Sequence, residues 1–263
     1  MIRLDGKYAV VTGATRSIGE FIARGLHAAG AHVLITGIED EAGRSLAASL
    51  GERAEYRRVD VAVDDDIDAC VRYVKEKNAC LDILVNCACS YVDKGLATSR
   101  ADWLSTLNVN LVGAAIFVQK AVPIMKQPGG VIVNIGSVSG KAAMADRGPY
   151  SMSKAALMHL TRCAAAALGD RGVRVVTVSP GWTWSPPMET MTGNDRALAD
   201  RGGAHTHPLG RVGRMDEVAN AVVFACSDEA SWINGCDIPV DGGFSALGPN
   251  QGRMPQYWLD LSR

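Results

Sequence analysis

Short apolar runs alternate with longer segments in which apolar residues recur every three or four positions, along nearly the whole chain. The short runs predict buried strands of a parallel sheet, and the longer segments predict helices that pack on it. This repeated order is typical of a doubly wound α/β fold with helices on both faces of one sheet. We expect about seven strands, near residues 7–12, 32–36, 54–59, 82–86, 130–135, 173–178 and 236–240. The helices are expected near residues 18–29, 40–50, 64–77, 100–125, 150–169 and 215–227.

Two segments depart from this alternation. Residues 184–210 are rich in Trp, Pro, Gly and His and contain only one short helical pattern, near 190–200. A long irregular stretch inside a compact domain is commonly a lid over a site. The tail, residues 244–263, carries large apolar side chains such as Tyr257 and Trp258, which a monomer would leave exposed. We therefore expect a single domain over residues 1–263, with a substrate lid at 184–210 and a C-terminal tail that docks on another surface.

Composition and charge narrow the class of protein. The 263 residues suffice to bury one core. The net charge is −1 without a basic run, which argues against nucleic acid and membrane as partners. Seven cysteines without a Cys-x-x-Cys pair favour a reducing compartment, and no signal peptide or membrane-length apolar stretch is visible, so we expect a cytoplasmic protein. His205 and His207 lack a clear third ligand, so no metal site is expected.

A glycine-rich segment, residues 12–19, lies between the first expected strand and the first expected helix. At such a turn, backbone N–H groups and the positive end of the helix face the pyrophosphate of a dinucleotide. Gly13 and Gly19 alone are a weak signal, but the strand before them and the helix after them strengthen it. The segment therefore predicts a nucleotide-binding turn.

Ser137, Tyr150 and Lys154 form a second chemical pattern. Tyr150 and Lys154 are four apart in an expected helix, so they share a face. A free phenol has a pKa of about 10, and an ammonium about 5 Å away contributes roughly 3 kcal/mol toward ionising it, to which a cationic nicotinamide would add. Ser137, thirteen positions before Tyr150, is expected to donate a hydrogen bond to a substrate oxygen that gains negative charge. The pattern predicts hydride transfer with a tyrosine as general acid or base.

Together with Asn110, these residues resemble the short-chain dehydrogenase/reductase family, whose motifs are TGxxxGxG and YxxxK, and the resemblance covers almost the whole chain. It implies a single-domain Rossmann-type fold and a catalytic tetrad of Asn110, Ser137, Tyr150 and Lys154. In this tetrad Tyr150 transfers a proton to or from the substrate oxygen, and Ser137 polarises that oxygen. Lys154 also binds the nicotinamide ribose, and Asn110 helps to hold a water that links Lys154 to solvent.

The resemblance also implies which residues hold a nicotinamide cofactor. Asp60 and Val61 are expected beside the adenine, and Ser185 is expected to reach the nicotinamide carboxamide. The full set extends from the glycine-rich turn across the ends of several strands: Gly13, Thr15, Arg16, Ser17, Ile18, Gly19, Gly37, Ile38, Asp60, Val61, Asn86, Ala88, Tyr150, Lys154, Pro180, Gly181, Thr183 and Ser185.

Two departures from the family pattern affect the pocket. Ser17 stands where the glycine motif has its middle glycine, and because serine is small we expect cofactor binding to be kept. Cys87 and Cys89 occupy two positions of the family's NNAG sequence, so we expect an altered pocket wall.

A third departure concerns the choice of cofactor. Gly37 and Ile38 carry neither the acid that binds the adenosine ribose nor the arginine that binds a 2′-phosphate. Arg16 would attract a 2′-phosphate, whereas Glu39 and Asp40 would repel it. We expect NAD in preference to NADP, and we expect Gly37→Asp to strengthen that preference by adding a ribose partner.

The expected activity is that of an NAD(P)-dependent alcohol dehydrogenase or carbonyl reductase acting on a small secondary alcohol or ketone. The same residues fit an NADPH-dependent 3-oxoacyl-thioester (acyl-carrier-protein) reductase, and a nucleotide-binding protein without turnover is a more distant alternative. Trp182 and Trp184 are expected near the nicotinamide, either lining a ring-shaped substrate or packing in the interior. The resemblance implies a homotetramer, or a homodimer, with an interface on the helices near 100–125 and 150–169.

Overall fold

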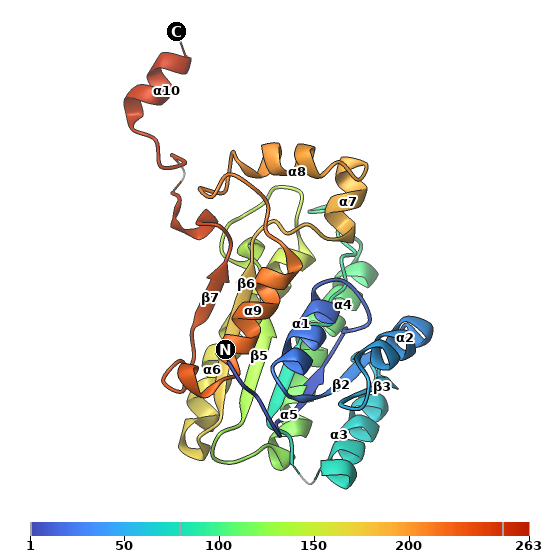
Figure 1. Cartoon of the computed structure of the whole chain (residues 1–263). Helices are drawn as coiled ribbons and strands as arrows, with labels where there is room; N and C mark the ends of the chain where they lie inside the picture. The colour runs from blue at the N-terminus through green and yellow to red at the C-terminus, as the bar shows by residue number, and fades with distance from the viewer. Residues whose placement is uncertain (1, 79, 249, 263) are drawn as a thin grey trace.

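The structure is a computed structural model that describes residues 2–78, 80–248 and 250–262. Its centre is one seven-stranded parallel sheet in the order β3-β2-β1-β4-β5-β6-β7 (Figure 1). This architecture confirms the α/β fold expected from the alternating sequence pattern. The strands are β1 (Tyr8–Val11), β2 (His32–Gly37), β3 (Ala54–Arg58), β4 (Ile83–Asn86), β5 (Val131–Ile135), β6 (Arg174–Pro180) and β7 (Asp237–Val240).

The chain builds the sheet in two directions from β1. It first adds β2 and β3 on one side and then crosses over to add β4 to β7 on the other. Val10 of β1 is in register with Leu34 of β2 and with Leu84 of β4. The strand order therefore reverses between β1 and β4, and ligands of open α/β sheets bind outside the carboxyl ends of the strands at such a point.

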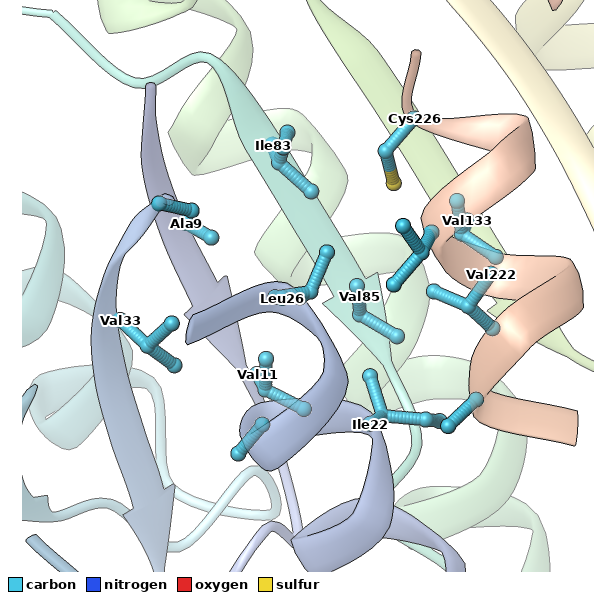
Figure 2. Close-up of a cluster of buried hydrophobic side chains, with 14 of the residues drawn as sticks. Ala9, Val11, Ile22, Leu26, Val33, Ile83, Val85, Val133, Val222 and Cys226 are labelled. Atoms are coloured by element: carbon cyan, nitrogen blue, oxygen red, sulfur yellow. The ribbon is translucent and has the colours of Figure 1, made fainter. Parts of the chain in front are cut away.

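One face of the sheet is covered by α1 (Ser17–Ala28), α2 (Asp40–Leu50) and α9 (Met215–Ala225). Ile22 and Leu26 of α1 and Val222 of α9 point toward the sheet in Figure 2 and are fully buried. Because the central strands are covered on both faces, they are continuous apolar runs rather than alternating ones. This is why the strands of the middle of the sheet could be recognised from sequence.

The opposite face carries α3 (Asp64–Asn78), α5 (Ala114–Ala121) and α6 (Pro149–Leu168), with α4 (Arg100–Leu107) beside α6. Phe117 of α5 and Leu168 of α6 belong to the core cluster on this side. The continuous helical stretch Arg100–Ile124 is long and apolar enough to cross a membrane by length and composition. Its buried residues nevertheless pack against the sheet, as the core helices of soluble domains do.

The single helix expected over 100–125 is interrupted. After α4 the chain forms a π-helical turn, η1 (Asn108–Gly113), then α5, then a 3₁₀ turn, η2 (Val122–Ile124). A π-helical turn adds one residue to the hydrogen-bonded repeat and is frequent at functional sites. Here it brings Asn110 to the end of β4, where its side chain bonds to Ser90.

The segment expected to be irregular, 184–210, contains two short helices, α7 (Pro186–Thr192) and α8 (Arg196–Gly203), which lie over the carboxyl ends of the strands (Figure 1). The tail ends in a helix, α10 (Pro255–Leu261), that extends away from the body of the protein (Figure 1). Short 3₁₀ turns complete the chain: η3 (Val138–Gly140), η4 (Gly169–Arg171), η5 (Asp228–Ala230) and η6 (Phe244–Ala246).

Candidate active site

A cleft of about 990 Å³ lies outside the carboxyl ends of the central strands, where the strand order reverses. This volume is at the upper end of the range for small-molecule sites, as a dinucleotide together with a substrate requires. All the residues expected to bind the cofactor line this cleft except Asn86. Of the tetrad, Ser137, Tyr150 and Lys154 line it, and Asn110 lies behind its wall.

The glycine-rich turn fits closely against the end of β4. Gly13 has a φ of +62°, and a Cβ added there would lie 2.6 Å from the Cα of Ala88, so only glycine fits. Ser17 also adopts a left-handed φ of 55°, which costs a residue with a Cβ roughly 1–2 kcal/mol. Its Oγ lies 3.8 Å from the Sδ of Met215. The backbone of this turn is therefore closely packed against the end of β4.

The end of β2 carries a paired carboxylate. Glu39 accepts a hydrogen bond of 2.5 Å from the Thr15 hydroxyl, and its other oxygen lies 3.3 Å from Nε of Arg16. Asp40 lies outside the cleft lining and accepts a 2.8 Å hydrogen bond from the Tyr56 hydroxyl. Arg16 would attract the 2′-phosphate of NADP, whereas Glu39 would repel it. Because the two side chains form an ion pair, their charges partly neutralise each other.

A side chain at Gly37 would meet the side chain of Thr15. A Cβ at Gly37 would lie 2.8 Å from Cγ2 of Thr15 and 3.1 Å from its hydroxyl. The substitution Gly37→Asp would therefore displace Thr15 from Glu39 as it adds a ribose partner. That it strengthens the preference for NAD stays a prediction.

Tyr150 is held in the first turn of α6 by Asp93. The carboxylate of Asp93, on the loop after β4, accepts hydrogen bonds from the backbone N–H groups of Gly148 (2.8 Å), Gly95 (2.9 Å) and Tyr150 (3.0 Å). These N–H groups include donors that the start of a helix leaves without a partner inside the helix. The hydrogen bonds lower the pKa of Asp93 against the opposing effect of its burial. No local sequence pattern indicates this contact, because Asp93 lies 57 residues before Tyr150.

Lys154 is buried on the same side of α6. Its Nζ donates a 2.8 Å hydrogen bond to the carbonyl of Ile135 at the end of β5 and lies 5.8 Å from the centre of the Tyr150 ring. Burial lowers the pKa of Lys154, but interactions with Cys89 and Tyr150 outweigh it, so the pKa is raised overall. Lys154 is therefore a fixed positive charge beside the phenol.

The phenol itself is not acidified in the free protein. Burial raises the pKa of Tyr150, while the charge of Lys154 and hydrogen bonding with Ser137 lower it to a smaller extent. The net direction is upward, so the charge of Lys154 lowers the pKa of Tyr150 but does not overcome the effect of burial. A second positive charge, such as that of an oxidised nicotinamide, would lower this pKa further.

Asn110 and Asn86 form hydrogen bonds between elements that surround the cleft. Asn110 is 2% exposed; its Nδ2 donates to the carbonyl of Ser90 (3.0 Å) and to the Ser153 hydroxyl (3.1 Å), and its Oδ1 accepts from the Ser90 N–H. Asn86 donates a 2.9 Å hydrogen bond to Oδ1 of Asn134 within the sheet. Both side chains thus position neighbouring elements.

An aromatic residue that the sequence analysis missed lies against Tyr150. The ring of Tyr91 stacks on that of Tyr150 with centroids 5.0 Å apart and 22° between the planes. Tyr91 follows the altered NNAG segment, and only the path of the loop after β4 brings it to the site. The two tyrosines form one aromatic wall of the cleft.

The tryptophans and histidines near the lid region have different surroundings: Trp182 and Trp184 are partly buried, His205 is exposed and His207 is buried. Trp182 lines the cleft, whereas Trp184 lies against Arg196, 5.4 Å from its guanidinium carbon. His207 is 2% exposed and accepts a 3.1 Å hydrogen bond at Nε2 from the Trp182 N–H. Burial lowers the pKa of His207, so it is a neutral support for the Gly181–Trp182 backbone. Within residues 2–78, 80–248 and 250–262, no three His, Cys, Asp or Glu side chains are grouped to hold a metal ion.

Comparison with known proteins agrees with this geometry. A family model described as enoyl-(acyl carrier protein) reductase matches residues 13–245. A crystal structure of a short-chain dehydrogenase/reductase from Brucella melitensis superposes with a TM-score of 0.86 at 31% identity, covering 92% of this chain and 98% of that one. The chain belongs to the short-chain dehydrogenase/reductase family. Members of this family are oxidoreductases that use NAD(P), and this short-chain dehydrogenase/reductase acts on alcohols or the corresponding carbonyl compounds.

Two relatives of this chain are named for different substrates. The cis-4-hydroxycyclohexanecarboxylate dehydrogenase of Sinomonas cyclohexanicum is 34% identical over 253 residues, covering 92% of this chain and 97% of the relative. The 3-oxoacyl-(acyl-carrier-protein) reductase of Aquifex aeolicus is 37% identical over 249 residues, covering 92% and 98%. Each is similar along most of this short-chain dehydrogenase/reductase.

The contact between Asp93 and the start of α6 gives a test of how Tyr150 is positioned. Asp93→Ala should lower the free energy of unfolding by about 1–3 kcal/mol, because it leaves helix-end donors without a partner. It should also lower kcat more than it raises KM for the cofactor, since it displaces Tyr150. Denaturant unfolding and steady-state kinetics measure the two effects.

The pH dependence of this contact has a defined sign. The pKa of Asp93 is lower in the folded protein than in the unfolded chain. Its contribution to the free energy of unfolding is therefore complete above the unfolded pKa of about 3.9, and it is lost as the pH falls through the folded pKa. Asp65→Ala, an exposed aspartate on α3, is the control. Equal stability and kinetics in the two variants would show that Asp93 does not position Tyr150.

Proposed function

We propose that the protein transfers a hydride between NAD and a secondary alcohol or ketone carried on a ring, with Tyr150 as the general acid or base. The observation that carries this proposal is the place of the Tyr150 phenol in the cleft. Lys154 Nζ lies 5.8 Å from its ring centre, and the interaction with Ser137 lowers the pKa of the phenol, as the charge of Lys154 also does. The ring alcohol is the substrate class named in the Sinomonas relative, and the stacked rings of Tyr91 and Tyr150 offer a flat apolar wall to such a substrate.

Each side chain has a separate task in the proposed reaction. Ser137 donates a hydrogen bond to the substrate oxygen, and Tyr150 removes its proton during alcohol oxidation or returns it during ketone reduction. Lys154 stabilises the phenolate and binds the ribose next to the nicotinamide. Asn110 holds the loop after β4 against α6 through Ser90 and Ser153. When bound, the nicotinamide supplies the acceptor or donor of the hydride.

A screen of initial rates tests the proposed reaction. We expect NADH formation from cyclohexanol derivatives and NADH oxidation with the matching cyclohexanones, followed by absorbance of the reduced nicotinamide. A protein that turns over none of these rings, with either NAD or NADP, does not have this function.

The alternative is an NADPH-dependent 3-oxoacyl-thioester reductase. It is favoured by the 37% identity to the Aquifex reductase, and the proton transfer proposed for Tyr150 would serve the reduction of a 3-oxoacyl thioester as well. Acetoacetyl thioester in place of the cyclohexanone distinguishes the two. A higher kcat/KM for the thioester would establish the alternative in place of the ring substrate.

We propose NAD as the preferred cofactor because Glu39 lines the cleft at the end of β2. A 2′-phosphate carries nearly two negative charges and would be repelled by this carboxylate by roughly 1–1.5 kcal/mol across about 6 Å of water. We therefore expect a higher kcat/KM with NAD than with NADP, and a gap about tenfold smaller in Glu39→Gln. Glu41→Gln, at an exposed position on α2, serves as the control. A wild-type preference for NADP would instead make Arg16 the selecting residue.

The oligomer is proposed to be a homotetramer, or a homodimer, in the cytoplasm. Leu104 of α4, Val112 of η1 and Met152 of α6 are 61%, 45% and 59% exposed, on the helices expected to form a subunit interface. Exposed apolar side chains gathered on neighbouring elements are typical of protein–protein contacts. Residues 184–210 are proposed as the lid of the cleft, because Thr190 and Met191 of α7 line it.

The tail offers a test of this assembly. Tyr257 and Trp258 of α10 contact each other with ring centroids 5.1 Å apart and remain 43% and 40% exposed. We expect them to pack on a neighbouring subunit near the mouth of its cleft. Truncation after residue 246 should therefore raise KM for the substrate and weaken the oligomer in light scattering. An unchanged assembly with unchanged kinetics would show that the tail has no such role.

A further inference from the structure

The cleft contains five charged side chains, and four of them have partners. Arg16 pairs with Glu39, the Asp60 carboxylate accepts a 2.9 Å hydrogen bond from the Ala62 N–H, and Lys154 donates to the Ile135 carbonyl. The fifth, Arg147, forms no ion pair or side-chain hydrogen bond found within residues 2–78, 80–248 and 250–262. Its interaction there is with a ring: the guanidinium carbon lies 5.5 Å from the centre of Tyr150.

Arg147 is placed by the backbone that leads into α6. Its N–H donates a 3.0 Å hydrogen bond to the carbonyl of Met144, and the next residue, Gly148, is held by Asp93. The positive charge of Arg147 contributes to the lowered pKa of Asp93. The oxygens of Asp93 accept hydrogen bonds from backbone N–H groups, and in the described part of the chain Asp93 forms no ion pair with the guanidinium. The guanidinium thus lies beside the ring of Tyr150, and its donors have no hydrogen-bond partner among the residues that the structure describes.

The cleft that Arg147 lines is rich in apolar side chains. Its lining includes aromatic residues, methionines and prolines, such as Tyr91, Met144, Trp182 and Pro187, together with hydroxyl groups such as those of Ser137 and Thr190. A half-buried guanidinium in such surroundings is stabilised most by an anion that accepts hydrogen bonds from two of its parallel N–H groups. A carboxylate matches its charge. A phosphate, with nearly two charges, would keep one of them uncompensated in an apolar cleft.

We propose that the substrate is a hydroxy acid, a secondary alcohol whose ring or apolar body also bears a carboxylate, and that Arg147 binds this carboxylate. This inference rests on the proposed function, since it places the alcohol at Tyr150. Arg147 selects the substrate and orients it, because the carboxylate at Arg147 and the hydroxyl at Tyr150 and Ser137 fix two points of one molecule. The acid itself takes no part in the hydride or proton transfer.

Binding tests the inference without turnover. Calorimetric titration of the protein in saturating NADH with cyclohexanecarboxylate should give saturable binding that is about 10–100-fold weaker in Arg147→Met, as loss of a charge-assisted hydrogen bond requires. Arg147→Lys should restore part of it, because the charge returns without the planar fork. Arg72→Met, an exposed arginine on α3, should bind like the wild type. Cyclohexanecarboxamide, which has the same shape and no charge, should bind weakly to all four proteins.

Kinetics separate the inference from the proposed function. We expect wild-type kcat/KM to be at least tenfold higher for 4-oxocyclohexanecarboxylate than for its methyl ester, and this ratio to collapse in Arg147→Met. Turnover of the ester equal to that of the acid, with carboxylate binding independent of Arg147, overturns the hydroxy-acid assignment while the proposed function stands. Carboxylate binding that depends on Arg147, with neither ketone reduced, supports the anion site and overturns the proposed reaction.

Discussion

Tyr150→Phe is expected to lower kcat by about 10²–10⁴-fold while it changes the affinity for the cofactor little, because it removes the transferable proton and keeps the ring. The ring contacts Tyr91, at 5.0 Å between centroids, and lies 5.5 Å from the guanidinium carbon of Arg147. The phenylalanine should therefore occupy the same place. Steady-state rates and titration with NADH measure the two quantities.

Two further variants make this result specific. Tyr73→Phe removes a hydroxyl on α3 that bonds to Glu55, far from the cleft, and should leave kcat unchanged. Tyr91→Phe removes the other hydroxyl of the stacked pair and separates its effect from that of Tyr150. Turnover by Tyr150→Phe within a factor of a few of the wild type would exclude Tyr150 as the acid or base.

Periodicity predicted the elements that are held together by the core. The central strands β1, β4 and β5 are covered on both faces, so their apolar runs stand out in the sequence. It did not predict the π-helical turn η1, because the choice between an α and a π repeat depends on where Asn110 finds partners. Those partners are Ser90 on the loop after β4 and Ser153 on α6, which only the folded chain brings together.

Motif spacing predicted which residues share a cleft better than it predicted their energetics. The glycine-rich turn and the pair Tyr150–Lys154 line the same cleft, as the resemblance implied. Asp93, Tyr91 and Arg147 were missed, because each reaches Tyr150 through a loop whose path no local pattern records. The effect of burial on the phenol was missed for the same reason: it is set by every element around the cleft.

Burial and Lys154 have opposite effects on the pKa of Tyr150. The pKa of Tyr150 is raised in the free protein because burial outweighs the charge of Lys154. A base must be deprotonated to act, so alcohol oxidation should accelerate as pH rises toward the pKa of Tyr150 in the complex with the oxidised cofactor. Lys154 holds that pKa lower than burial alone would set it, and its removal should move the profile in a known direction.

Lys154→Met is expected to lower kcat at neutral pH by at least 10²-fold and to shift the rise of the pH profile toward higher pH by about two units. A unit charge 5.8 Å from the ring centre, at an effective dielectric near 20, contributes roughly 3 kcal/mol, which corresponds to about two pKa units. KM for NAD should also rise, because the proposed ribose contact is lost. The buried methionine keeps most of the volume of the lysine stem, so the packing of α6 against β5 is retained.

The pH profile distinguishes this electrostatic role from a structural one. If Lys154 only supported α6 through its 2.8 Å hydrogen bond to the Ile135 carbonyl, its loss would lower stability and rate at every pH without moving the profile. Lys75→Met, at an exposed position on α3, should reproduce the wild-type profile and rate. A profile that stays in place in Lys154→Met would assign the phenol's ionisation to the cofactor alone, and a rise shifted by about two units would assign a share of it to Lys154.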